Sequence, residues 1–330
     1  SGPQSTLFGK NASAGAVSIV TKAPSDQFEA KIDAGIGNYN QRILKGYVTG
    51  PLSDNLAYSL SAGSHQRDGY SEGLQGFKDL NDRNRWNVRG QLLFTPSEDV
   101  SLRVIADYSK IDEICCTVAN VVNGESITAT INTLAGMQAV LEPGSSFNYE
   151  SLLDFNPASD IEDGGISLHA EIDFEGFTFT SISAYRFNES HRTGDIDYTA
   201  LDIASAESFP EVKALSQEFR LTSTGDGPLS WIVGGFLFKE EISSYGWTLY
   251  GEDLRPFVDG LLSPAFFGPG ALTGAMSLLE LITGTPAGGF YPAGTRTIGD
   301  SGVDTDSYAV FGTVDYQLSE ALTATIGLNY

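Results

Sequence analysis

A hydropathy period of two recurs along most of this 330-residue chain. In residues 85–94, apolar side chains alternate with charged or amide side chains, and the same split recurs in residues 166–174, 308–316 and 322–330. Successive side chains of a strand point to opposite faces. Each segment therefore predicts a strand with one apolar and one polar face, and the fold class is predicted to be all-β and antiparallel.

The connections between these strands alternate in length. Short turns are expected at residues 51–54, 96–99, 175–176, 224–228 and 318–320. After a short first loop at residues 37–40, the intervening connections are long, at residues 64–84, 111–164, 188–210 and 242–306. Short turns at one end and long loops at the other are typical of outer-membrane β-barrels. A soluble β-sandwich would seldom place all of its long loops at one end.

Composition and charge narrow the classes of function. No apolar run approaches the length of about 18 residues that a transmembrane helix requires, whereas barrel strands leave hydropathy averages near neutral. The chain has 42 acidic and 19 basic residues and a formal net charge of -23. We therefore expect no nucleic-acid partner, because binding to phosphates requires clustered Lys and Arg. The acidic stretches at residues 195–211 and 300–306 are predicted to be solvated loops.

The number of strands bears on closure of the barrel. Counting from residue 28 predicts about 11 strands, whereas bacterial single-chain barrels have an even number. An open sheet edge would leave backbone N–H and C=O groups unpaired in lipid, which costs several kcal/mol for each group. We therefore expect the chain to be a fragment of a larger barrel, with Tyr330 at an internal boundary.

Several phrases resemble a known family. Residues 2–12 (GPQSTLFGKNA) and 15–22 (GAVSIVTK) are similar to the closing segment of the plug in TonB-dependent outer-membrane receptors. Ser1 and Ser5 stand where the family usually has Arg and Gly. Further phrases similar to the family are at residues 50–54, 216–222, 231–236 and 307–312. The resemblance implies that residues 1–24 end the plug, and that residues 25–330 form the N-terminal half of a transmembrane barrel of about 22 strands.

The resemblance also implies a function and a location. It implies active uptake of a bulky, scarce nutrient across the bacterial outer membrane, with outer-membrane lipid, TonB and the inner-membrane energising complex as partners. TonB would act through a segment upstream of Ser1. The ligand is expected to be a small molecule or metal chelate, with a ferric siderophore as the commonest cargo class; vitamin B12, haem and oligosaccharide stay open. A passive porin or a surface adhesin is the rival, which the plug-like opening disfavours.

Aromatic residues near the long loops are the candidate ligand contacts, because rings bury large areas with little loss of entropy. These candidates are Tyr70, Phe77, Tyr245, Trp247, Tyr250 and Phe257. The alternative is a girdle of rings at the membrane interface. Charged side chains on the polar strand faces are interpreted first as partners of the plug and second as ligand contacts; they are Arg67, Arg85, Arg89, Arg103, Arg186, Arg220, Asp107, Glu171, Asp173 and Glu218.

The remaining motifs predict no catalytic or metal chemistry. The Gly-Asp-Ser-Gly phrase at residues 299–302 is expected in an acidic loop, and His65 and His169 fall on strand faces, so we expect no enzyme. The three histidines lack metal-ligand spacing, so no metal or cofactor is expected. Residues 271–283 predict a short helix that either lines the mouth or packs within its own loop. Whether Cys115 and Cys116 form a disulfide is left open.

Overall fold

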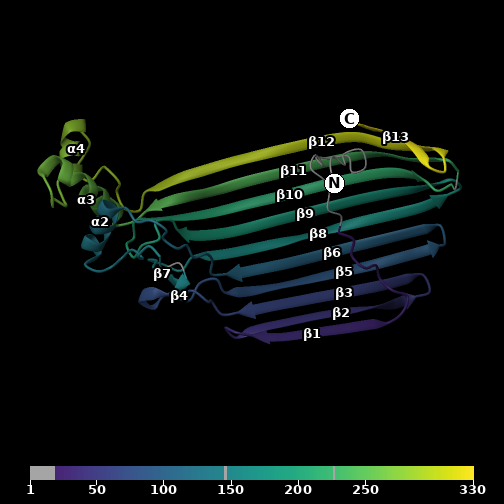
Figure 1. The fold of residues 1–330 in the computed structure, drawn as a ribbon, viewed down its shortest axis with the longest axis horizontal. Helices are drawn as coiled ribbons and strands as arrows, with labels where there is room; N and C mark the ends of the chain where they lie inside the picture. The colour runs from purple at the N-terminus through teal and green to yellow at the C-terminus, as the bar shows by residue number, and fades with distance from the viewer. Residues whose placement is uncertain (1–18, 145–146, 226) are drawn as a thin grey trace.

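The computed structural model describes residues 19–144, 147–225 and 227–330. In these residues the chain forms one antiparallel sheet of 11 strands, which are hydrogen-bonded in chain order (Figure 1). The strands are β1 (Glu29–Gly37), β2 (Gln41–Ser53), β3 (Leu56–Arg67), β5 (Arg83–Ser97), β6 (Val100–Glu113), β8 (Ala158–Phe174), β9 (Phe177–Asp195), β10 (Ala204–Ser223), β11 (Leu229–Tyr250), β12 (Arg296–Ser319) and β13 (Leu322–Asn329). The predicted all-β antiparallel class and the predicted number of strands are confirmed.

Short and long connections lie at opposite ends of the sheet, as the sequence predicts (Figure 1). The hairpin of β8 and β9 shows why a short turn suffices: Phe174 pairs with Phe177, and Gly176 adopts a φ of 90°. A positive φ of this kind costs glycine little, because it has no Cβ. At the other end, β4 (Glu72–Gly73) pairs in parallel with β7 (Glu150–Ser151) and joins two long connections.

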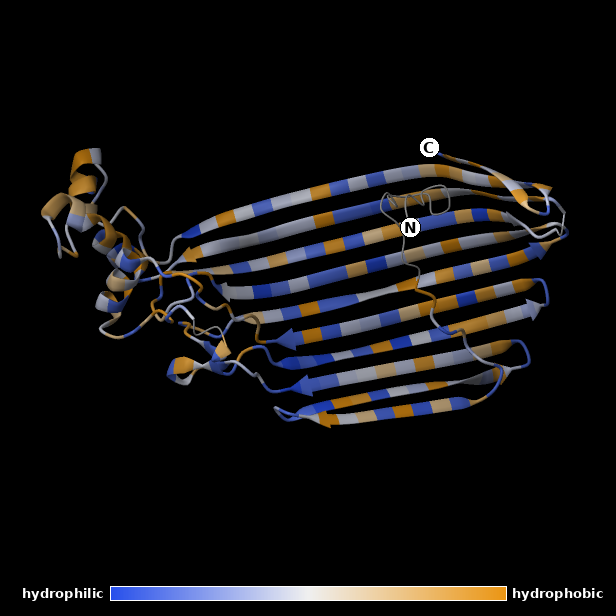
Figure 2. Ribbon diagram, in the orientation of Figure 1, coloured by the Kyte–Doolittle hydropathy of each residue, from blue (hydrophilic) through white to orange (hydrophobic). Residues whose placement is uncertain are grey.

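The two faces of the sheet differ in chemistry, and Figure 2 shows the alternation along each strand. Partners opposite one another in the register lie on the same face, so one side of the sheet can be followed from strand to strand. The inner face is defined here as the side that carries Arg89, Asp107 and Arg186. The outer face is the opposite side, and it carries Leu92 and Leu168.

The strands at the long-loop end extend further than the sequence predicted. Residues 188–210 and 242–306 were expected to be loops, but β9 continues to Asp195 and β11 to Tyr250, and β12 begins at Arg296. The prediction failed for β9 because residues 188–195 are polar on both faces, so the hydropathy period disappears there while the backbone pairing continues. The phrase at residues 299–302 accordingly lies in β12, with Ser301 opposite Ser244.

Three helices lie in the long connections at the same end: α2 (Glu125–Ala135), α3 (Leu254–Phe267) and α4 (Ala275–Thr283). Helix α4 confirms the helix predicted at residues 271–283, whereas α2 and α3 were not predicted. A small apolar cluster, the loop core, joins the connections, and consists of Ile131, Ala139, Val140, Leu201 and Ile203. None of the helices in the described ranges has the length and apolar character needed to cross a membrane.

The adjacent cysteines lie just after β6, and the structure joins Cys115 to Cys116 as a disulfide. The segment around them is attached to the end of β5. The Ile114 N–H donates to Asp82 Oδ1 at 2.7 Å, and the Asn81 side chain donates to Thr117 Oγ1 at 2.9 Å. These hydrogen bonds hold the start of the long connection against the mouth of the sheet.

Candidate functional site

An open hollow of about 700 Å³ lies at the long-loop ends of β3, β5 and β6 and is called the mouth hollow here. It combines cationic, anionic and aromatic side chains. Its lining residues are Gln66, Arg67, Asp68, Gly69, Phe77, Lys78, Asp79, Asp82, Arg83, Asn84 and Ile114. Arg67 and Arg83 are register partners on the inner face. The hollow is therefore continuous with the polar side of the sheet.

Tyrosine rings stand beside the mouth hollow. The ring of Tyr70 contacts Tyr149 edge-on, with 5.8 Å between centroids, and Tyr39 at 6.3 Å. The Arg67 guanidinium lies 5.0 Å from the centroid of the Tyr70 ring, within the range of a cation–π interaction. One Arg67 amino group donates to the Asn81 carbonyl, but the buried Nε has no hydrogen-bond partner. The Arg67 guanidinium thus keeps its Nε–H donor unpaired beside the Tyr70 ring.

A buried carboxylate fixes the wall of the hollow. Glu113 is 5% exposed and accepts two hydrogen bonds of 2.7 Å from Arg85, from Nε and from Nη2. It also accepts from Arg83 Nη1 at 3.3 Å and from the Asn84 N–H at 3.2 Å. Bidentate pairing of this kind is strong and fixes direction. Burial raises the pKa of the neighbouring Asp82 carboxyl, and the charge of Glu113 adds to the effect.

The inner face binds the segment that precedes β1, which crosses the sheet in Figure 1. Arg103 donates to the carbonyls of Thr21 and Lys22, each at 3.2 Å, and to Thr21 Oγ1 at 3.0 Å. Arg89 also donates to Thr21 Oγ1, at 3.3 Å. Arg186, further along the inner face, pairs with Asp107 at 2.6 Å. Arg89 and Arg103 therefore bind the segment before β1, whereas Arg186 pairs within the sheet; the interpretation that these charges are partners of the plug stays a prediction.

The outer face carries an apolar belt, defined as its exposed apolar residues along the middle and the short-turn end of the strands. Exposed apolar surface of this extent marks an interaction with an apolar medium or partner. The belt includes Leu60, Leu92, Phe94, Ile166, Leu168, Phe174, Leu215, Phe219, Val233, Leu237, Tyr308, Val310, Val314, Tyr316, Ile326 and Leu328. Ile166 is 53% exposed and Val310 62% exposed, so the strand residues most suited to a core are in fact uncovered.

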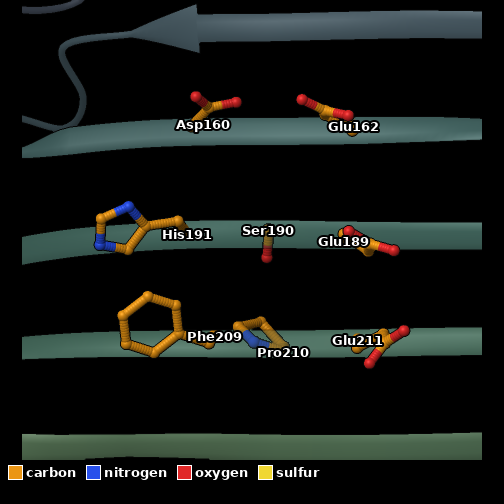
Figure 3. A pocket seen from close by; sticks show the side chains of 8 residues that line it. All are labelled: Asp160, Glu162, Glu189, Ser190, His191, Phe209, Pro210 and Glu211. Carbon is orange, nitrogen blue, oxygen red and sulfur yellow. The ribbon is translucent and has the colours of Figure 1, made fainter.

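Charged residues follow the belt on the outer face toward the long loops. Figure 3 shows a hollow of about 370 Å³ in this region, where Glu162 of β8, Glu189 of β9 and Glu211 of β10 follow one another across the strands. Lys110 pairs with Glu162 at 3.0 Å and with Asp160 at 3.5 Å. The change from apolar to charged along the same face marks the level at which the outer face meets water.

The aromatic candidates from the sequence do not form one site. Tyr70 and Phe77 lie at the mouth hollow. Trp247 and Tyr245 lie on the outer face of β11, where they are opposite Glu207 and Phe209 of β10. The remaining two candidates are Tyr250, at the end of β11 with its ring 6.2 Å from Tyr291, and Phe257 of α3, which packs against the loop core.

An aromatic cluster surrounds the two outer-face candidates. The ring of Phe209 is 5.5 Å from Trp247, 6.4 Å from Tyr245 and 4.6 Å from His191. The Arg296 guanidinium lies 4.5 Å from the Trp247 ring. On β11, Lys239 and Glu241 separate this cluster from Leu237 of the apolar belt, so the cluster lies on the long-loop side of the charged residues. A girdle of rings would border the apolar belt directly, so this position does not favour the girdle alternative.

Sequence reasoning missed most residues of the mouth, among them Tyr39, Tyr149 and Arg83. Two of them, Tyr39 and Tyr149, have φ values of 58° and 56°, in a region that tyrosine seldom adopts. Tyr39 follows Asn38 in the short first loop. A tyrosine in a tight turn was the one feature of the sequence that could have indicated its place at the mouth. Tyr149 reaches Tyr70 through the pairing of β4 with β7, which no local pattern indicates.

Comparisons with known proteins support the architecture. No family model matches the chain. The pesticin receptor of Yersinia pestis is 37% identical over 57 residues, which are 17% of this chain and 8% of the receptor. The ferric yersiniabactin uptake receptor FyuA from the same species has a TM-score of 0.58 at 14% identity, over 97% of this chain and 49% of FyuA. The strand order and curvature of such receptors are thus present here.

The chain has the fold of a TonB-dependent outer-membrane receptor. Two further structures with this receptor fold cover nearly the whole chain. The ferripyoverdine receptor of the outer membrane of Pseudomonas aeruginosa has a TM-score of 0.61 at 14% identity, over 99% of this chain and 40% of the receptor. The siderophore receptor PiuA from Acinetobacter baumannii has a TM-score of 0.59 at 12% identity, over 100% of this chain and 49% of PiuA. The chain therefore spans about half the length of solved proteins with the receptor fold.

Proposed function

We propose that this chain is part of a TonB-dependent receptor that imports a ferric siderophore across the bacterial outer membrane. The observation that carries the proposal is the fold, which matches uptake receptors over 97% to 100% of the chain. The short match to a pesticin receptor at 37% identity supports the same family. As a transporter the protein would make no covalent change in its cargo, so no catalytic residue is part of the proposal.

The apolar belt supports the membrane location. Its residues share the outer face, and charged side chains replace them toward the long loops. A barrel strand in lipid requires an apolar outer face of about this kind, bounded by aromatic residues. The long loops lie beyond the charged end of the outer face and would then face the cell exterior.

The mouth hollow supports a metal chelate as the cargo. Arg67, Arg83 and Lys78 supply positive charge beside an equal number of aspartates, and Tyr70 and Phe77 supply ring surface. Guanidinium groups bind carboxylates and other planar oxygen donors through paired hydrogen bonds and also stack on rings. An anionic chelate with aromatic or conjugated groups would use both kinds of contact. The neighbours named above are a ferric yersiniabactin, a ferripyoverdine and a siderophore receptor, which points to the same cargo class.

Residues 1–24 are proposed to end the plug, although residues 1–18 lie outside the described part of the chain. Support comes from Thr21 and Lys22, whose carbonyls accept hydrogen bonds from Arg103 on the inner face. A plug held in this way would sit against the polar side of the sheet. Pulling by TonB, driven by the proton-motive force, would then have to break these contacts locally to admit the cargo.

Uptake by whole cells tests the proposal. Cells with the full-length gene and cells with a deletion would be grown in iron-depleted medium and supplied with radiolabelled ferric siderophores, with and without an uncoupler. We expect growth and uptake to need both the gene and the proton-motive force. Rescue confined to vitamin B12, haem, copper or an oligosaccharide would keep the transporter and reject the siderophore. Uptake that persists in the uncoupler would instead identify a passive porin, and loss of cell adhesion alone an adhesin.

A further inference from the structure

An apolar cavity of about 520 Å³ lies on the outer face across β1, β2, β3 and β5, and is called the outer groove here. Small residues form its floor: Gly46 of β2 lies opposite Ala62 of β3, and Ser64 follows Ala62 on the same face. Its sides are taller, because Ser64 stands between Leu44 of β2 and Trp86 of β5. A Cβ added to Gly46 would meet no atom within 4 Å, so the floor is open.

The dimensions of the outer groove suit one hydrocarbon chain. Leu44 and Trp86 stand two strand spacings apart, which is about 9.6 Å between the backbones of their strands. The next row repeats the arrangement, with two small residues between Ile32 of β1 and Val88 of β5. Three inner-face residues border the groove only through their main chain, because alternate side chains point to the opposite face; they are Lys45, Gly63 and Asn87. Cavities that hold small molecules have volumes of about 300–1,000 Å³.

One wall of the outer groove is held in place. The ring of Trp86 lies 5.4 Å from the ring of Tyr108 on β6. Tyr108 donates its hydroxyl to Glu162 at 2.6 Å, and Glu162 also pairs with Lys110, the register partner of Trp86. These contacts fix the ring, but Trp86 is still 43% exposed. Part of the ring is therefore available to a ligand in the groove.

A cation without a partner marks the polar end of the outer groove. Arg42 of β2 follows Leu44 on the outer face toward the long loops and is exposed. No Asp or Glu in the described ranges forms an ion pair with Arg42, whereas three lysines of the outer face are each paired with a glutamate. Those lysines are Lys110, Lys213 and Lys239. A free guanidinium suits phosphate, which it binds through paired hydrogen bonds.

We infer that the outer groove binds one lipid of the outer leaflet, with an acyl chain along Gly46 and Ala62 and a phosphate on Arg42. Toward the short turns the groove opens on the apolar belt at Leu60, which follows Ala62 on β3. Toward the long loops, Arg42 supplies the charge that complements a phosphate. Long loops of outer-membrane barrels face the cell exterior, which places the groove in the outer leaflet. The inference rests on the outer-membrane location proposed above and does not depend on the cargo.

Quenching of Trp86 fluorescence by a brominated lipid tests the inference. The full-length receptor in maltoside detergent would be titrated with phosphatidylglycerol that carries a dibrominated acyl chain, and the signal of Trp86 would be taken as the difference from Trp86→Phe. We expect quenching that saturates. Quenching that rises without saturation would show general contact with lipid and would overturn the inference, as would absence of quenching, whether or not a second copy of the receptor covers the groove. The assay contains no siderophore and no TonB, so its result is independent of the uptake test.

Gly46→Leu fills the floor of the outer groove, and Gly235→Leu is the matched control. Gly235 lies on the outer face of β11, where an added Cβ meets nothing closer than 3.8 Å. Each methylene group taken out of apolar contact lowers affinity about fourfold, so a leucine that displaces two of them should raise the half-quenching concentration roughly fifteenfold. Gly235→Leu should leave that concentration unchanged. Equal curves for Gly46→Leu and the wild type would refute the groove.

Arg42→Gln separates the head of the lipid from its chain. It should raise the half-quenching concentration of the brominated phosphatidylglycerol about tenfold, because hydrogen bonds to a charged group are lost. It should not change that of a diacylglycerol with the same brominated chain, whereas Gly46→Leu should weaken binding of both lipids. Lys239→Gln is the matched control, since Lys239 is paired with Glu241 at 2.7 Å on the same face. An equal effect of Arg42→Gln on the two lipids would contradict the phosphate contact.

Retained lipid gives an independent measure if Gly46→Leu fails to fold. Native mass spectrometry of the purified wild-type receptor and of Arg42→Gln would count the phospholipids that remain bound after washing with detergent. We expect lipid to remain on the wild type and to be lost more readily from Arg42→Gln. A wild-type receptor without any retained phospholipid would overturn the inference.

Discussion

Truncation of Ile131 should open the loop core. Ile131 lies on α2, is 3% exposed and packs with Val140, Leu201 and Ile203. Replacing a buried isoleucine by alanine costs about 2–5 kcal/mol, and by valine about 0.5–1.5 kcal/mol, because a cavity adds to the lost transfer free energy. Ile127 on the same helix is 48% exposed, so Ile127→Ala leaves almost no cavity and serves as the matched control.

Hydrogen exchange of the receptor in detergent measures this effect directly. At about 1.4 kcal/mol for each factor of ten, Ile131→Ala should raise exchange of the α2 amides about 30-fold or more, and Ile131→Val about 2- to 13-fold. Amides of β8 to β11 should be unchanged, since their ladder hydrogen bonds do not depend on the loop core. Equal exchange in Ile131→Ala and Ile127→Ala would refute the role given to the loop core.

Three further predictions concern the mouth and the loops. Tyr70→Ala and Arg67→Gln should each weaken binding of the labelled ferric siderophore about tenfold or more. Phe266→Ala, at an exposed ring on α3, is the control and should leave the affinity unchanged. Equal affinities of all three variants would contradict the mouth hollow as the binding site. Burial raises the pKa of Asp154 to about 7, above the unfolded value near 3.9, so the loops should lose stability as pH rises from about 4 to 7, as measured by limited proteolysis within residues 196–203. The ratio of wild-type to Asp154→Asn cleavage rates checks this, and a constant ratio would count against it. The pKa of Glu280 is lowered to about 2, chiefly by its hydrogen bonds to Arg255. Glu280→Gln should therefore speed proteolytic cleavage between α3 and α4 at pH 7. An unchanged cleavage rate would contradict this prediction.

The aromatic candidates show where sequence reasoning about the site ends. Tyr70, Phe77, Tyr245 and Trp247 look alike in the sequence, as rings close to long polar connections. The register of β11 against β10 puts Tyr245 and Trp247 on the outer face, whereas Tyr70 stands at the mouth hollow. Residue type could not separate a ring at the mouth from a ring on the outer face, because that difference is one of position relative to the two faces.

The extent of the strands shows a second limit. The hydropathy period locates a strand where one face is apolar, and it correctly placed residues 85–94 and 166–174 within β5 and β8. It is silent where both faces meet water, so the end of β9 was taken for a loop. Backbone hydrogen bonds continue there regardless of side-chain polarity, and only the pairing of neighbouring strands reveals them.

The sequence alone determined the class of fold, the order of hairpins and the two faces of the sheet, because period two and turn chemistry are local properties of the chain. The tertiary structure decided which distant residues meet. Tyr70 reaches Tyr149 through the pairing of β4 with β7, and Ile131 of α2 packs with Leu201 in the loop core. Such meetings depend on how loops pack against one another, and loop packing leaves no periodic trace in the sequence.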